Sequence, residues 1–184
     1  MESENYFSVP CRLPVNLAVL TGHDLDCDER SFEAQIPDVF RLASEVATLD
    51  AAGLRSLRAV GDNARDLADH LNLLSRKINA VMGYVLLRED EPANRFHTSR
   101  LSAEALWLEE PLPLAPGAAV SIKLFVPEEQ LAIYGWGKVS EHSAGGSQIQ
   151  FTRLREQDRE LLIRVTLHQQ TRLLKARAAR KESS

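Results

Sequence analysis

The residues from Leu57 to Val85, LRAVGDNARDLADHLNLLSRKINAVMGYV, place apolar side chains at alternating steps of three and four. This heptad spacing is typical of an α-helix that supercoils with a partner of similar length. Asp50 can cap a helix start and no proline follows until Pro92, so we expect one long helix from about Asp50 to Arg88. The predicted seam consists of Leu57, Val60, Ala64, Leu67, Leu71, Leu74, Ile78, Val81 and Val85.

The residues that flank this seam indicate how many chains assemble. With Leu57 at heptad position a, the β-branched Val60 and Val81 fall at d, the reverse of the preference of parallel dimers. The e positions are small or apolar: Gly61, Ala68, Ser75 and Met82. We therefore predict a homotetramer, with a trimer or a dimer as alternatives and the parallel or antiparallel orientation left open. The other interpretation is that the stripe packs on its own domain.

The segments around the long helix predict an α+β fold. A short strand is expected between Tyr6 and Leu20, a first helix from Pro37 to about Leu49, and a last helix from about Glu156 to Arg177. After Pro92 the apolar period changes to two, which is typical of half-buried strands; it is clearest at Val120, Ile122, Leu124 and Val126. Clustered strands beside segregated helices indicate α+β rather than a parallel α/β sheet.

Composition and charge exclude several functional classes. The 22 Lys and Arg residues against 26 Asp and Glu residues give a net charge of −4, which argues against a nucleic-acid binder. No apolar run is long enough for insertion into a membrane, so we expect a cytoplasmic protein. The cysteines and histidines show no metal-ligand spacing and no catalytic motif occurs. We therefore expect no metal, no cofactor and no enzymatic activity.

Three stretches after residue 99 are RLSAEALWLEEPLPLAPGAAVSIKLFVP, YGWGKVSEHSAGGSQIQFTRL and REQDRELLIRVTLHQQ. Together with residues 6–20 they resemble the PilZ domain, a small antiparallel β barrel with a C-terminal helix that is known as a bacterial receptor for cyclic di-GMP. The first stretch resembles the family's second and third strands, the second the closing strands and the third the terminal helix. Residues 6–20 are similar to the first strand, so residues 35–90 become a helical oligomerisation segment inserted before the remaining barrel, residues 94–176.

The ligand motifs of that family are altered in this chain. The family binds its nucleotide with Arg-x-x-x-Arg ahead of the first strand and Asp/Asn-x-Ser-x-x-Gly at the second. Residues 100–105, RLSAEA, keep Ser102 but have Arg100 and Ala105 in place of the first and last positions. In the first motif, Arg12 is followed four residues later by Asn16. The resemblance therefore implies degraded binding motifs.

Together these features predict a noncatalytic bacterial signalling adaptor of PilZ type, serving motility or virulence and assembling through the heptad helix. Its partners would be copies of itself and an unidentified signalling protein. The alternative is a cyclic-di-GMP receptor that binds the nucleotide through a nonstandard site made of Arg95, Arg100 and Ser102.

Overall fold

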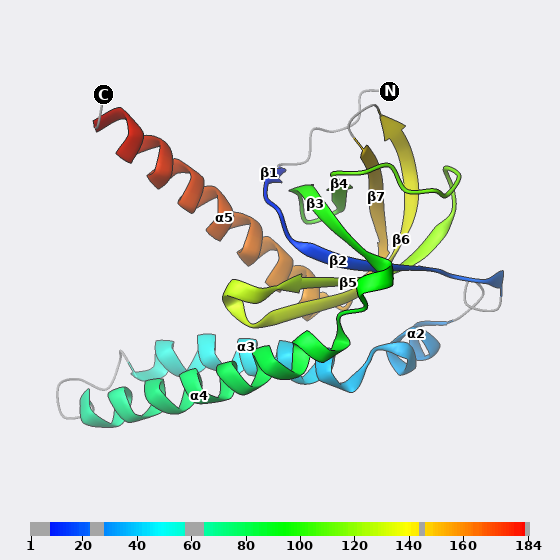
Figure 1. Cartoon of the computed structure of the whole chain (residues 1–184). Helices are drawn as coiled ribbons and strands as arrows, with labels where there is room; N and C mark the ends of the chain where they lie inside the picture. The colour runs from blue at the N-terminus through cyan, green and yellow to red at the C-terminus, as the bar shows by residue number, and fades with distance from the viewer. Residues whose placement is uncertain (1–7, 23–27, 58–64, 144–145, 183–184) are drawn as a thin grey trace.

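The computed structural model describes residues 8–22, 28–57, 65–143 and 146–182. Six strands form a closed antiparallel barrel in the order β3-β2-β5-β6-β7-β4, and β4 pairs with β3 to complete the circle (Figure 1). The barrel strands are β2 (Pro14–Val19), β3 (Arg95–Leu101), β4 (Ala105–Leu108), β5 (Ala119–Val126), β6 (Leu131–Ser143) and β7 (Gly146–Arg153). A two-residue strand, β1 (Val9–Pro10), pairs with β3 beyond the end of β2. The predicted α+β class and the PilZ-like barrel are confirmed.

The alternation of buried and outward-facing side chains along the strands explains how the barrel interior is filled. In β5, Val120, Ile122, Leu124 and Val126 are fully buried in the barrel interior, as their period of two predicts. Side chains from the other strands and from the start of the last helix fill the same core. Closure leaves the barrel strands without a free edge, which removes a common route to aggregation.

Two glycines allow β6 and β7 to approach closely. A Cβ atom at Gly137 would lie 2.7 Å from Cγ2 of Ile149 and 2.8 Å from the backbone oxygen of Gln150. At Gly135, a Cβ atom would lie 2.9 Å from the backbone oxygen of Arg153. The register between β6 and β7 shifts between Trp136 and Gly137, so the strand bends here.

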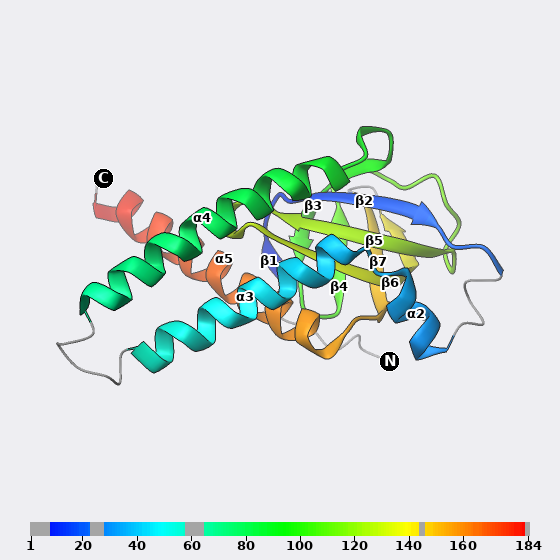
Figure 2. The ribbon, with the colours of Figure 1, turned by 90° about the horizontal axis from the view of Figure 1, so that it is seen from below.

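The helices before β3 cover one outer face of the barrel. They are α2 (Glu29–Gln35), α3 (Asp38–Leu57) and α4 (Arg65–Glu89), and α5 (Glu156–Glu182) follows β7. Figures 1 and 2 show α3 and α4 side by side on the β5–β6 side of the barrel, running in opposite directions. The insertion between β2 and β3 is therefore a helical hairpin preceded by one short helix.

The prediction of one continuous helix from Asp50 to Arg88 is wrong. Residues 50–57 are the end of α3, and α4 begins at Arg65. α3 and α4 pack against each other and run in opposite directions, which a single straight helix through residues 50–88 could not do. The turn-forming sequence Gly61-Asp62-Asn63 falls between the two helices, outside the described residues.

The helical insertion is held by a second apolar core. Its aromatic members interlock: the rings of Phe32 and Trp136 meet edge to face at 5.1 Å, and those of Phe40 and Phe125 lie 5.7 Å apart. The full cluster comprises Phe32, Ile36, Phe40, Ala43, Met82, Leu86, Phe125, Ala132, Tyr134 and Trp136. Phe32 and Ile36 come from α2 and its C-cap, in a region where the sequence analysis predicted no helix.

We predict that Gly137→Ala lowers the free energy of unfolding by about 1–3 kcal/mol, because the added methyl group meets backbone and side-chain atoms. Urea denaturation measures the change. Gly22→Ala is the matched control, since a Cβ atom at Gly22 meets nothing within 4 Å and should leave stability nearly unchanged. Equal stability of the Gly137→Ala variant and the parent would contradict the close approach.

Candidate functional site

An apolar stripe on α4 is exposed in the single chain. Leu67, Ile78 and Val81 have exposed fractions of 57%, 50% and 62%, whereas Met82 and Leu86 on the neighbouring side of the helix are buried. The N-terminal part of α4, which carries Leu67, extends past the barrel beside α3 (Figures 1 and 2). Ile78 and Val81 lie nearer the barrel, on the side of α4 next to the one that Met82 and Leu86 bury. We define the α4 seam as Leu67, Leu71, Leu74, Ile78, Val81 and Val85.

The remaining members of the predicted seam are placed differently. Leu57 is the last residue of α3 and so belongs to the other arm of the hairpin. Val60 and Ala64 lie outside the described residues. Within α4 the steps of three and four continue, and of the six seam residues only Val85 is half-buried. The described seam therefore lies on one face of a helix of 25 residues and is shorter than the predicted seam.

Two of the positions predicted for a nonstandard nucleotide site, Arg95 and Arg100, lie far apart along β3. Arg95 begins β3 and forms an ion pair with Asp90, with 2.6 Å between Nη2 and Oδ2. Arg100 lies five residues further along the same strand, roughly 16 Å away at the usual strand rise. Its Nη2 donates to Oγ of Ser8 at 2.6 Å. Each guanidinium already has a partner within its own chain.

Ser102 is a turn residue. It is fully buried, and its Oγ accepts hydrogen bonds from the backbone N–H groups of Glu104 and Ala105 at 3.2 and 2.9 Å. The same hydroxyl lies 3.1 Å from the carbonyl oxygen of Ala105. These contacts shape the tight connection between β3 and β4 and leave the hydroxyl unavailable to a ligand.

The altered first motif is also occupied by structural contacts. Nε of Arg12 donates to both carboxylate oxygens of Glu109, at 3.0 and 3.1 Å. Asn16 is buried, where its side-chain amide donates to Oδ1 of Asp90 and to the carbonyl oxygen of Glu91 and its Oδ1 accepts from the Glu91 N–H. Asn16 thus anchors the chain as it leaves α4 for β3, a role that an arginine could not fill in the same space.

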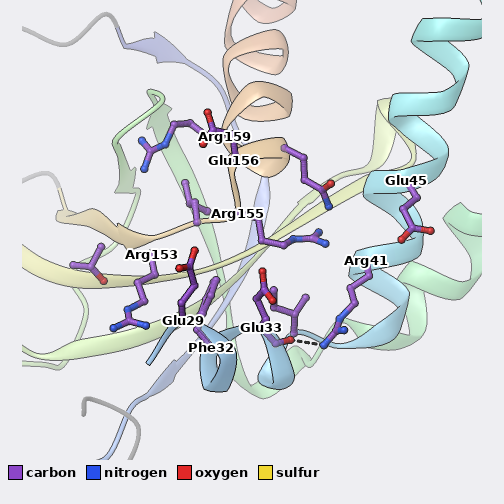
Figure 3. Close-up of a pocket in the computed structure, with 13 residues that line it drawn as sticks. Glu29, Phe32, Glu33, Arg41, Glu45, Arg153, Arg155, Glu156 and Arg159 are labelled. Carbon is purple, nitrogen blue, oxygen red and sulfur yellow. Dashed lines mark hydrogen bonds between the residues drawn. The ribbon is translucent and has the colours of Figure 1, made fainter. Parts of the chain in front are cut away.

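A cavity of about 880 Å³ lies where α2 and α3 meet the end of β7 and the start of α5 (Figure 3). The sequence analysis did not single out its charged residues, although three arginines crowd into residues 153–159. Four arginines and four glutamates line it: Arg41, Arg153, Arg155, Arg159, Glu29, Glu33, Glu45 and Glu156. This balance of charge gives no net positive field of the kind that phosphate binding requires.

Two of these arginines already have structural roles. Arg155 forms an ion pair with the fully buried Asp158, with 2.7 Å between Nε and Oδ2, and donates to Oγ of Ser44. Oγ of Ser44 in turn lies 2.6 Å from Oδ1 of Asp158. The guanidinium of Arg153 lies over the ring of Trp136, 5.4 Å from its centre. The cavity wall is thus the joint between the helical insertion and α5.

The described part of the chain contains neither a group of side chains that could bind a metal nor a thiol of lowered pKa. Among the described residues, no group of three or more His, Cys, Asp or Glu side chains is placed to hold a metal ion. Burial raises the pKa of the Cys11 thiol, which a hydrogen bond from Thr98 partly offsets. Cys27 lies outside the described residues. None of the described helices has the length and apolar character needed to cross a membrane.

Comparison with solved structures identifies the fold. A pathogenic protein from Xanthomonas campestris, described as a tetrameric PilZ domain self-assembled via an unusual helical bundle, matches over 94% of this chain and 92% of its own, with TM-score 0.57 and 18% identity. The fold is that of a PilZ domain. The inhibitor of motility from Bacillus subtilis matches over 42% of each chain, with TM-score 0.39 and 15% identity. No protein-family model and no curated protein matches the sequence.

The buried ion pair at the joint behind the cavity should contribute more to the stability of this PilZ fold than an exposed ion pair does. We predict that Asp158→Ala lowers the free energy of unfolding by about 3–5 kcal/mol, because it leaves the largely buried Arg155 guanidinium without its anion. Glu109→Ala, which breaks the exposed ion pair with Arg12, should cost less than about 1 kcal/mol. Chemical denaturation of both variants measures the contrast, and equal effects would refute it.

Proposed function

We propose that this protein is a noncatalytic signalling adaptor of PilZ type that assembles with copies of itself through the α4 seam, with four chains as the favoured stoichiometry. The observation that carries the proposal is the exposure of Leu67, Ile78 and Val81 on a helix that extends past its barrel. Isolated apolar residues on a surface are ordinary, but a continuous stripe at heptad spacing marks an interaction face.

The energetics favour covering this stripe. Fully burying one Leu, Ile or Val side chain contributes about 1.5–3 kcal/mol. The α4 seam offers five strongly exposed side chains, Leu67, Leu71, Leu74, Ile78 and Val81, each of which would gain part of that amount in every copy. Association must also offset about 4–15 kcal/mol of lost translational and rotational freedom, which a symmetric seam on this scale can meet.

The comparison supports self-association through this region. The Xanthomonas protein is described as assembling through a helical bundle, and the match spans 94% of this chain, which includes α3 and α4. Each chain supplies two antiparallel helices, so two chains already bring together the four helices of an ordinary bundle. The hairpin thereby replaces the single long helix as the unit of assembly that we propose.

Introducing charged side chains into the α4 seam tests whether it mediates association. We predict that Leu71→Glu combined with Leu74→Glu lowers the mass in solution below that of the parent, because association would bury like charges in every copy. Multi-angle light scattering measures the mass, and the parent should give four times the chain mass of 20.5 kDa. Val19→Glu, an exposed apolar residue on the barrel, is the matched control and should retain the parental mass. An unchanged mass for the doubly substituted chain would refute the seam.

Nucleotide binding is the competing function, and the site geometry argues against it. Arg95 lies at the other end of β3 from Arg100, and Arg95, Arg100 and Ser102 each already bond within the chain. The arginine-lined cavity carries as many carboxylates as guanidiniums. We predict that calorimetric titration with cyclic di-GMP gives no saturable heat. A saturable affinity in the micromolar range that Arg100→Ala abolishes would replace the adaptor proposal with a receptor at the nonstandard site.

A further inference from the structure

The last helix, α5, has apolar residues on two opposite faces. Leu161, Leu162 and Val165 are buried against the barrel. Ile163, Leu167 and Leu174 have exposed fractions of 42%, 51% and 56%. At about 100° per residue, these three lie within roughly 40° of one another and point away from the barrel-facing side. A surface helix of a monomer would carry polar residues on that outer face.

This helix also extends well past the barrel. Figure 1 shows its C-terminal half projecting away from the rest of the molecule. From Leu174 to Ala179 every side chain is exposed. Most helical stability in proteins comes from packing of an apolar face rather than from helix propensity. A cover on the apolar side of the projecting half would therefore stabilise it.

The outer stripe of α5 has the spacing of a coiled-coil seam. Residues 160, 163, 167, 170, 174 and 177 advance by alternating steps of three and four. The N-terminal end of this stripe is acidic, with Glu160, and its C-terminal end is basic, with Arg177. Neither side chain has an ion-pair partner among the described residues, so the two charges remain available.

These charges determine the direction in which two copies of the stripe can pair. In an antiparallel pair centred between residues 168 and 169, Glu160 faces Arg177 and Ile163 faces Leu174. Leu167 then faces Gln170, and each of these contacts occurs twice because of the two-fold symmetry. A parallel pair would place Glu160 on Glu160 and Arg177 on Arg177, which is repulsive. Antiparallel pairing also aligns the opposite ends of the two helix dipoles.

We propose that the outer stripe of α5, defined as Glu160, Ile163, Leu167, Gln170, Leu174 and Arg177, is a second self-association surface that docks α5 of another copy in antiparallel orientation. The overlap from Glu160 to Arg177 spans roughly 27 Å of helix. Gln170 interrupts the apolar seam near its centre, and a polar residue in that position selects one register over others. This surface is separate from the α4 seam, so each chain offers two different faces to its copies.

The experiment uses the full chain with Leu71→Glu and Leu74→Glu, so that association through the α4 seam does not contribute. Sedimentation equilibrium of this variant should show a monomer–dimer equilibrium at micromolar and higher concentrations. Adding Glu160→Arg should weaken the dimer about tenfold, because two attractive pairs become repulsive. Adding both Glu160→Arg and Arg177→Glu should restore the affinity, since the pairs re-form with reversed sign.

Lys175→Glu is the matched control, because it reverses a charge on the same exposed end of α5 but lies off the stripe. It should leave the dimer unchanged. A monomeric mass at all concentrations, or a double reversal as weak as Glu160→Arg alone, would overturn the proposal. Circular dichroism should give the same helix content for every variant, because all the substituted side chains are exposed. Loss of the α4 seam and loss of the α5 contact are thus measured separately.

Discussion

The structure depends on the two-faced hairpin of β5 and β6. Its inner face contributes Ile122, Leu124 and Ile133 to the barrel core, and its outer face presents Phe125, Tyr134 and Trp136. A barrel with three aromatic residues on its outside would expose a large apolar patch, which a soluble monomer avoids. The helical insertion supplies the side chains that cover this face, so it stabilises the barrel as well as extending it.

That cover determines where the two proposed association surfaces lie. Packing Met82 and Leu86 on the barrel turns the neighbouring side of α4 outward, and the length of α4 carries its first turns past the barrel. The buried network of Ser44, Arg155 and Asp158 then ties α3 to the start of α5. Since α4 packs beside α3 and α3 is tied to α5 by this network, the packing holds the α4 seam and the outer stripe of α5 in one relative orientation within the chain.

The sequence predicted the strand pattern because burial on one side repeats every two residues, as in β5. It did not predict where the helices turn back, because the heptad period continues by coincidence from Leu57 into α4 while the chain reverses. The short helix α2 was missed for a related reason: its two buried residues, Phe32 and Ile36, are too few to show a period. In both cases the structure is determined by packing between residues that are distant in sequence, and the local apolar period does not report such packing.

The candidate ligand positions show the same limitation. Arg95 and Arg100 are close in sequence, yet the extended backbone of β3 separates them and gives each a different partner. Conversely, Arg41 and Arg155 are more than a hundred residues apart and line one cavity (Figure 3). The distance between two residues of one strand can be predicted from the sequence. The contact between α3 and α5 cannot, because it depends on how α3 packs on the outer face of the barrel.

The two proposed surfaces together have a consequence for stoichiometry. A two-fold contact through the α4 seam alone joins two chains, and so does an antiparallel contact through α5. When the axes of two such contacts meet at right angles, four chains close into a tetramer in which every copy has the same environment. When the axes do not meet, the same contacts extend into a filament. A four-chain assembly can therefore close even where the α4 seam joins only two chains, because the second surface on α5 supplies the other contact and its orientation is fixed by the joint at Asp158.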